Sequence, residues 1–299
     1  MAASVASGAT RDDRVLPLTR SISLAIIPFL VVAFAVLYPF PHDTGRLFAW
    51  PIKPTITPMI LASVYIGGAY FFVRAATARD WHTVKGGFIP VGTFATLMGL
   101  ATVWHWDKFS HSHVAFWLWA GLYFTTPFLV FWVWWANRRQ DVPATSAEVL
   151  IPVGASRVIA LLGALSGLTA LFLFLLPGRA IAVWPWALTP LTAQVTGAIF
   201  ALGIAGLGTL TDRRWSSARV LFQVAALMLA LILVAGVRAS GELDPSSALT
   251  WLIGVGFAVV LAAIVALYVR MSAAPFAAID LPRPVRPLDH VERDITGLD

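Results

Sequence analysis

The side chains best suited to chemistry lie in one short stretch, residues 104–113, between two long apolar runs. Three imidazoles, those of His105, His111 and His113, and the carboxylate of Asp107 fall within nine residues. Imidazole and carboxylate ligands suit Zn²⁺ or Cu²⁺, and histidine also binds haem iron. The spacing matches no fixed metal motif. Three interpretations therefore stay open: a transition-metal or haem site, a pH sensor, and a solvated interfacial loop that binds nothing, which is the commonest case.

Several other kinds of reactive group are missing from the sequence. It contains no cysteine, which excludes disulfides, thiolate nucleophiles and iron–sulfur clusters. Its acidic residues and its three lysines all lie outside the long apolar runs. A charge at the bilayer centre costs at least about 2.5–3.5 kcal/mol and is kept mainly for function, so this distribution disfavours ion-coupled transport and a retinal Schiff base. With no nucleophile motif and no phosphate-binding glycine loop, the sequence favours a protein that is not an enzyme.

These groups must be positioned by helices that cross a lipid bilayer. Hydrophobic residues make up 59% of the 299-residue chain, charged residues only 12%, and the mean hydropathy is +0.79. Crossing ~30 Å of hydrocarbon takes about 20 apolar residues in a helix. Eight such runs predict an all-α, polytopic membrane protein. They cover residues 21–38, 56–73, 88–106, 114–136, 158–176, 190–210, 219–237 and 248–269.

Basic residues indicate how the predicted spans are oriented. Sixteen of the 21 lysines and arginines lie in the tails and in the loops after the second, fourth and sixth spans, and five lie in the other loops. Since such residues accumulate on the cytoplasmic side, both termini are predicted to be cytoplasmic. The excess of arginine over lysine is typical of GC-rich bacterial genomes, so the predicted location is a bacterial inner membrane.

The scatter of the basic residues also bears on partners. The isoelectric point is near 10.2, yet a nucleic-acid-binding protein gathers its basic residues on one soluble face. No such face is evident in short loops between apolar runs. The predicted partners are the lipid bilayer and another membrane protein, and nucleic acid is not among them.

Three short motifs occur twice in the same order. They are Trp50-Pro51, Thr57-Pro58 and Arg79-Asp80-Trp81 in the first half, and Trp184-Pro185, Thr189-Pro190 and Arg213-Arg214-Trp215 in the second. The two tryptophans of each set are 31 residues apart. This pattern predicts an internal duplication of four plus four spans with parallel orientation. The predicted organisation is a cytoplasmic tail (1–20), a first four-helix repeat (21–136), a cytoplasmic linker (137–157), a second repeat (158–269) and a cytoplasmic proline-rich tail (270–299).

The repeated motifs have a simple local interpretation. Thr57 and Thr189 are predicted to cap helix N-termini, each with a proline at the first helical position, where the missing N–H costs nothing. The tryptophans of both sets are predicted to lie in the aromatic belts at the two membrane surfaces. Each repeat therefore predicts one span that starts at the outer surface and ends at the inner one.

Two further patterns lie inside the spans. Gly163 and Gly167 form a small-xxx-small pair, which is typical of close helix packing within one bundle. The fourth span carries an aromatic face that either meets lipid or stacks on a cofactor such as a porphyrin, and lipid contact is the commoner role. The face consists of Trp117, Phe124, Phe128 and Trp135.

Three hypotheses for function follow from the sequence. The first is a non-enzymatic subunit, scaffold or assembly factor of a membrane complex. The second is a metal- or haem-binding protein that uses His105, His111, His113 and Asp107. The third is a passive carrier or channel for a small neutral or apolar solute, with a pathway between the two halves.

Overall fold

The computed structural model describes residues 12–145 and 148–273, and this part of the chain is helical, with no strands. The remaining residues, which include most of the two predicted tails, lie outside the described part. Eight helices are long and apolar enough to cross a membrane, so the chain is a multi-pass integral membrane protein. They are α1 (Pro17–Leu37), α3 (Ile56–Thr77), α4 (Phe88–Trp104), α5 (Val114–Asn137), α6 (Val153–Leu175), α8 (Pro190–Ala201) with its 3₁₀ continuation η6 (Leu202–Leu210), α9 (Trp215–Arg238) and α10 (Ala248–Ala273).

The eight predicted spans are confirmed, with boundaries that differ by up to five residues. Helices α1 and α6 begin earlier than predicted, because Pro17 and Pro152 lie at their starts, where proline is well tolerated. Two short helices, α2 (Thr44–Leu47) and α7 (Pro177–Val183), are absent from the sequence-based prediction. Both follow the first span of a predicted repeat.

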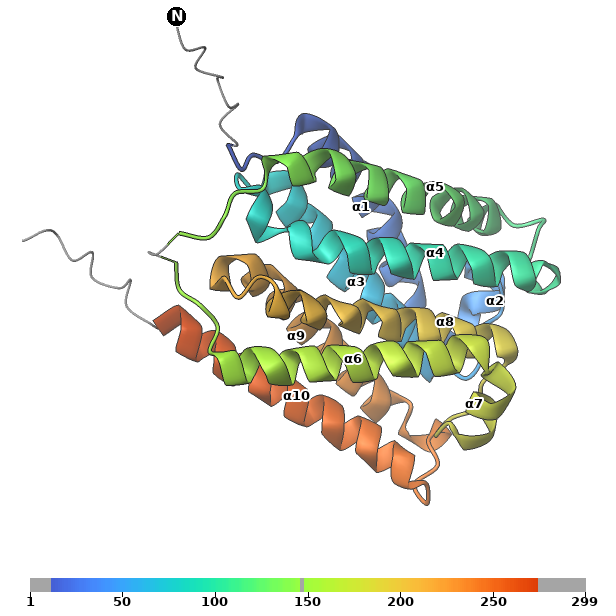
Figure 1. The fold of residues 1–299 in the computed structure, drawn as a ribbon. Coiled ribbons are helices and arrows are strands. Elements are labelled where there is room, and N and C mark those ends of the chain that lie inside the picture. The colour runs from blue at the N-terminus through green and yellow to red at the C-terminus, as the bar shows by residue number, and fades with distance from the viewer. Residues whose placement is uncertain (1–11, 146–147, 274–299) are drawn as a thin grey trace, which may run out of the picture.

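Helix α3 lies in the interior of the bundle, and α10 lies along one edge (Figure 1). Helix α3 packs mainly against α1 and α9, and most of its span is buried. Helix α4 packs against α5 and α8, and α6 packs against α8 and η6. Helix α10 packs mainly against α9, and none of its most apolar stretch is buried.

The first and last described residues lie at the same end of the bundle (Figure 1), as an even number of spans requires. We refer to this end as the terminal end and to the opposite one as the loop end. The terminal end comprises residues 12–16, 78–87, 138–145, 148–152 and 211–214, and the loop end comprises residues 38–55, 105–113, 176–189 and 239–247.

Glycines allow the backbones of α6 and η6 to approach closely. A Cβ atom on Gly163 would lie 2.9 Å from the carbonyl oxygen of Gly203, and one on Gly206 would lie 2.6 Å from the carbonyl oxygen of Ile159. Both distances are too short for any side chain. The predicted role of Gly163 in packing within one bundle is therefore confirmed.

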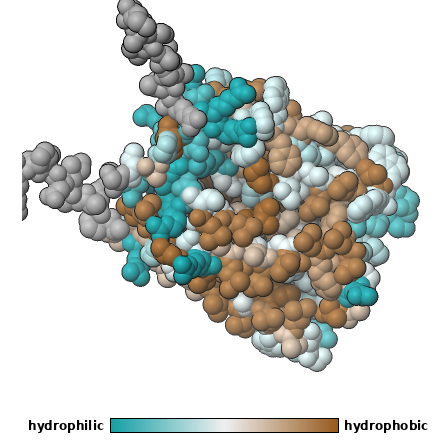
Figure 2. Space-filling model, viewed as in Figure 1, coloured by the Kyte–Doolittle hydropathy of each residue, from teal (hydrophilic) through white to brown (hydrophobic). Residues whose placement is uncertain are grey.

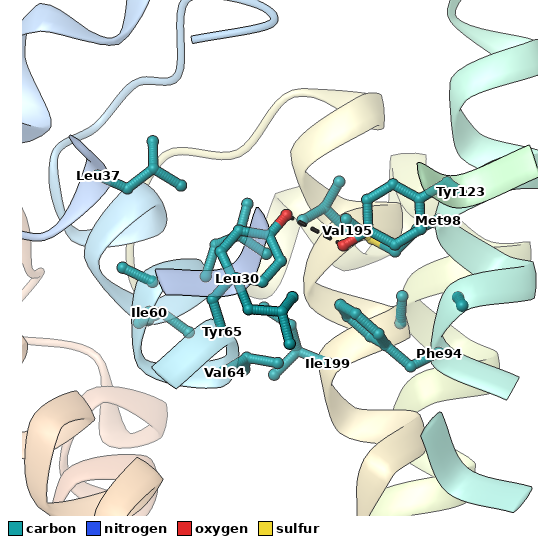
Figure 3. Close-up of a cluster of buried hydrophobic side chains, with 14 of the residues drawn as sticks. Leu30, Leu37, Ile60, Val64, Tyr65, Phe94, Met98, Tyr123, Val195 and Ile199 are labelled. Carbon is teal, nitrogen blue, oxygen red and sulfur yellow. Dashed lines mark hydrogen bonds between the residues drawn. The ribbon is translucent and has the colours of Figure 1, made fainter. Parts of the chain in front are cut away.

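The middle of the bundle is filled with buried side chains (Figure 3). Tyr65 of α3 and Tyr123 of α5 are hydrogen-bonded through their hydroxyl groups, 3.0 Å apart. Met98, Phe94 and Val195 lie beside this pair and are also buried. The pair satisfies two buried hydroxyl groups within an otherwise apolar core.

Apolar side chains cover much of the middle of the bundle surface, and polar residues gather mainly at its ends (Figure 2). The predicted aromatic face of α5 belongs to this surface, since Phe128 is 75% exposed and Trp117 is 58% exposed. Phe124 and Trp135 are exposed as well. The face points outward, which supports lipid contact rather than cofactor stacking.

Two local predictions are wrong. The predicted lipid contact is wrong for three of the four repeated tryptophans, because Trp50, Trp81 and Trp215 are at most 7% exposed and pack inside the protein. The predicted cap at Thr189 is confirmed, since its hydroxyl accepts a hydrogen bond from the first turn of α8. The equivalent cap at Thr57 is wrong, since α3 begins at Ile56, one residue before this threonine.

A carboxylate from the other half of the chain replaces the expected cap on α3. Glu242, in the loop between α9 and α10, accepts hydrogen bonds from the main-chain N–H groups of Thr55 (3.0 Å) and Ile56 (2.9 Å). Although partial burial opposes ionisation, these bonds and one from the Thr55 hydroxyl hold the pKa of Glu242 below its usual value. Glu242 also lines a loop-end cavity of about 510 Å³ together with His42 and Lys53.

Candidate functional site

Four chain segments meet at the terminal end through main-chain hydrogen bonds. The segment before α1 pairs with the loop after α3, where the N–H of Val15 donates to the carbonyl of Arg79. The linker before α6 pairs in the same way with the loop after η6, where the N–H of Ile151 donates to the carbonyl of Arg213. The first pairing holds the loop that contains Trp81. The second holds the residues just before α9, the helix that begins at Trp215, the counterpart of Trp81 in the repeated motif.

An aspartate, a histidine and a serine are hydrogen-bonded in series at this end. Oδ2 of Asp13 contacts Nδ1 of His82, and Oδ1 of Asp13 accepts a hydrogen bond of 3.1 Å from the main-chain N–H of His82. On the other side of the ring, Nε2 of His82 lies 3.1 Å from Oγ of Ser216. The side chains of His82 and Asp13 are 12% and 11% exposed. The carboxylate thus orients the imidazole, and the imidazole lies within reach of the hydroxyl proton.

The main chain fixes Asp13 in an uncommon conformation. Its φ is 53°, in the left-handed region that few residues other than glycine adopt. Its N–H donates to the carbonyl of Gln140, and its own carbonyl accepts from the N–H of Trp81. These contacts keep the carboxylate against the imidazole of His82. Strained backbone of this kind clusters at functional sites.

Ser216 lies in the first turn of α9, which begins at Trp215. The first four N–H groups of an α-helix have no partner within the helix unless a cap supplies one. Trp215 and Ala218 donate to main-chain carbonyls. In the part of the chain that the structure describes, the N–H groups of Ser216 and Ser217 have no acceptor. The serine hydroxyl therefore lies beside two open donors at the positive end of a helix dipole.

A buried arginine surrounded by carboxylates adjoins this series. Arg214 is 3% exposed, and its guanidinium lies 2.8 Å from Asp212, 3.5 Å from Asp141 and 4.0 Å from Glu148. Lys85 contacts both Asp141 (2.7 Å) and Asp212 (3.0 Å). The network connects the loop after α3, the linker between α5 and α6, and the loop after η6.

The charges in this network shift each other's ionisation. Although partial burial opposes ionisation of Asp212, hydrogen bonds from Arg214 and Lys85 hold the pKa of its carboxyl well below the usual value. The hydrogen bond to Asp212 raises the pKa of Arg214 in turn. Both groups are therefore charged at neutral pH.

A cavity of about 540 Å³ lies next to the network. Lys85, Arg138 and Asp212 are among its charged lining residues, and Ser217, the neighbour of Ser216, also lines it. The guanidinium of Arg138 lies 3.3 Å from the ring centre of Trp135. The apolar lining comes from α4, α5, η6 and α9, and includes Ile89, Pro90, Trp134, Ile204, Leu207 and Leu221.

At the loop end, the predicted metal ligands are bound to different partners. Nε2 of His105 lies 2.9 Å from Oε1 of Gln194. Nδ1 of His113 accepts a hydrogen bond from the N–H two residues later and so caps α5. His111 packs against aromatic rings, and Asp107 forms an exposed ion pair with its neighbour Lys108.

Among the described residues, no three histidine, aspartate or glutamate side chains are grouped so that they could hold a metal ion. The geometry therefore gives the metal or haem site of His105, Asp107, His111 and His113 no support, and the site stays a prediction. Comparisons with protein-family models, with curated proteins and with solved structures found no match to this chain.

Sequence reasoning missed Asp13, His82 and Ser216 as a group. They are separated by up to 203 positions, and no local motif joins them. One signal was present in the sequence, since His82 follows Trp81 and Ser216 follows Trp215 in the repeated motif.

Proposed function

We propose that the chain is a tandem duplication of a four-span unit. The helix neighbours support this, because α1–α3 and α4–α5 pack together in the first half as α6–α8 and α9–α10 do in the second. The halves meet through α3–α9 and α4–α8, as a twofold axis along the membrane normal requires. The isolated bridges Arg14–Asp80 and Leu150–Arg214 also occupy matching places.

The proposed orientation places the terminal end in the cytoplasm of a bacterial cell. Because the native chain contains no cysteine, single cysteines test this directly. A membrane-impermeant maleimide should label Ser110→Cys from outside the inner membrane, and Gln140→Cys only after the membrane is opened. Labelling of both positions from the same side would contradict the topology.

The proposed function is that of a subunit or scaffold in a membrane complex, with α10 as the helix that binds the partner. One observation carries this proposal, namely an exposed stripe of small residues on α10. The stripe consists of Gly254, Ala258, Ala262 and Ala266, each four residues after the last. A Cβ atom on Gly254 would meet no atom within 4 Å, so the space beside the stripe is open.

Small residues at this spacing let two helix backbones approach closely, which is how helices associate inside a bilayer. The exposed face of α5 carries bulky aromatic rings instead, as lipid contact favours. Helix α10 also gains little packing from its own chain, since it lies mainly against α9. The partner that fits this stripe is an apolar transmembrane helix of another protein.

Cysteine crosslinking in native membranes tests the proposal, with α5 as the matched control. Ala262→Cys, modified with a maleimide that carries a photoreactive benzophenone, should join the chain to a second membrane protein on illumination. Phe128→Cys on α5 should give no adduct, and Ala258→Ile combined with Ala262→Cys should lose it. An adduct between two copies of the chain would show that α10 binds its own kind, and adducts equal at both positions would contradict a specific partner.

A carrier is the second candidate, because cavities lie at both ends of the contact between the halves. The loop-end cavity is lined by Thr55 and Thr189, one from each half, and the terminal-end cavity by Lys85 and Asp212. The buried Tyr65–Tyr123 pair lies in the filled core of the bundle. Flux of a neutral solute into liposomes that contain only this protein would favour the carrier over the subunit.

A further inference from the structure

We propose that Asp13, His82 and Ser216 form a hydrolytic site that cleaves carboxylic esters. The proposal goes beyond a partner-binding role and rests on a different end of the molecule. It also departs from the sequence-based expectation that the protein is not an enzyme. The three residues are placed in the order that makes a serine hydroxyl nucleophilic: carboxylate, imidazole and hydroxyl.

The contact between base and nucleophile has the required length. A hydroxyl activated by histidine lies about 2.6–3.2 Å from the imidazole nitrogen, and Nε2 of His82 lies 3.1 Å from Oγ of Ser216. Because Asp13 contacts Nδ1, the proton of the neutral ring belongs on Nδ1, and Nε2 is left as the base. The hydrogen bond from the His82 N–H to the same carboxylate fixes the imidazole and the loop together.

The groups around Ser216 suit the charge that develops during ester cleavage. The main-chain N–H groups of Ser216 and Ser217 have no acceptor in the described part of the chain and lie at the start of α9. Such donors stabilise the oxyanion of a tetrahedral intermediate. Glu148 lies 3.9 Å from Nε2 of His82, and its charge favours the imidazolium that forms. Arg214, 4.0 Å from Glu148, offsets part of that charge.

The proposed reaction consumes one ester and one water. Oγ of Ser216 attacks the ester carbonyl carbon, and its proton passes to Nε2 of His82. The carbon–alkoxy bond then breaks, and His82 returns the proton to the departing alcohol. Water next attacks the acyl-serine, gives a proton to His82, and the bond between carbon and Oγ breaks. A carboxylic acid leaves, and the proton returns to Oγ.

The surroundings point to esters with an apolar acyl chain. The site lies in the first turn of α9, and the neighbouring Ser217 lines the cavity whose walls include Ile204, Leu207 and Leu221. An aliphatic chain fits such walls because burial removes its apolar surface from water. Medium-chain and long-chain esters are therefore the expected substrates, in preference to acetyl esters.

A fluorophosphonate probe tests the nucleophile directly on the detergent-solubilised full chain. We expect covalent labelling that mass spectrometry maps to Ser216 and that Ser216→Ala abolishes. Ser246→Ala is the control, since it removes an exposed loop-end hydroxyl that donates to Asp244 at 2.6 Å, and it should keep full labelling. A folded native protein that is not labelled, or equal labelling of Ser216→Ala, would overturn the proposal.

Hydrolysis of p-nitrophenyl octanoate tests the roles of the other two residues. Asp13 acts as a positioning residue, so Asp13→Asn should lower kcat by on the order of 10³-fold or more with little change in KM, because the amide stabilises the wrong tautomer of His82. A purely structural Asp13 would leave kcat intact in the folded variant. Unfolding temperatures confirm that each variant is folded, and rates equal to those of the native protein would refute the proposed series.

Discussion

The two ends of the bundle each place a histidine of the first half against a polar residue of the second, with different results. At the terminal end, His82 lies between the carboxylate of Asp13 and the hydroxyl of Ser216. At the loop end, His105 contacts the amide oxygen of Gln194, whose NH₂ group donates to the carbonyl of Phe174. The hydrogen bonds at the terminal end lead to a serine hydroxyl, which can react. Those at the loop end lead to the main-chain carbonyl of Phe174, which only accepts a hydrogen bond. Contact between the halves therefore places a histidine, and the chemistry of its neighbours decides what the histidine does.

The largest difference between the ends should appear when a charge is removed. Arg214→Ala leaves the carboxylates of Asp212, Asp141 and Glu148 close together without their buried counter-charge. Breaking a buried ion pair in this way costs about 3–5 kcal/mol of unfolding free energy. Denaturant unfolding in detergent measures this loss. Lys108→Ala at the loop end removes an exposed partner of Asp107 and should change stability by less than about 1 kcal/mol, and equal losses would contradict the comparison.

Acid should weaken the terminal end through Asp212. Its pKa in the folded protein lies well below its usual value of about 4. The unfolded chain therefore takes up the proton first as the pH falls, so the stabilisation is complete above about pH 5 and is lost below it. Unfolding temperatures measured between pH 3 and 7 should show a smaller acid-induced decrease for Asp212→Asn than for the native protein.

The matched control for this measurement is Asp107→Asn at the loop end. Asp107 also has a lowered pKa, caused first by its hydrogen bond with Lys108, but it is fully exposed. Its variant should keep the native pH profile. Glu242 and Asp244 also have lowered pKa values and make all three proteins less stable in acid. The test is therefore the difference between the pH profiles of the variants and that of the native protein. Identical profiles for the native protein and Asp212→Asn would disprove this role of Asp212.

A smaller effect is expected at the cap of α3. Glu242→Ala removes the acceptor of the N–H groups of Thr55 and Ile56, and loss of a helix cap costs about 1 kcal/mol. The matched variant is Thr189→Ala, which removes the cap of α8. Similar losses measured by denaturant unfolding would show that both halves depend equally on this cap. No loss in Glu242→Ala would indicate that water replaces the carboxylate.

The spans could be read from the sequence because they depend on a one-dimensional property. A run of about 20 apolar residues must cross the bilayer as a helix wherever its neighbours lie. The bounds of α5 (Val114–Asn137) agree with the predicted 114–136 for this reason. The 3₁₀ form of η6 was not predictable in this way, because the close approach of α6 at Gly203 and Gly206 accompanies it.

The candidate sites show the opposite situation. His105, His111 and His113 are close in the sequence, and this proximity suggested a common ligand set. In the folded chain the turn between α4 and α5 gives each of them a different partner. Asp13 and Ser216 are far apart in the sequence and are brought together only by pairing between loops of both halves. Tertiary contacts of this kind leave no local pattern, apart from the repeated tryptophans next to them.

The smallest effect should come from His111, which is exposed where His82 is mostly buried. His111 lies on the loop-end surface against Trp106, and His111→Ala should change the unfolding free energy by less than about 0.5 kcal/mol. The metal content and visible spectrum of the purified protein should also stay unchanged, because the loop-end side chains do not converge. If the metal or haem hypothesis is right, the native protein carries about one metal per chain, or a Soret band, that the variant loses. In that case the loop-end histidines converge only when the metal ion is bound, and each end of the bundle holds a reactive site.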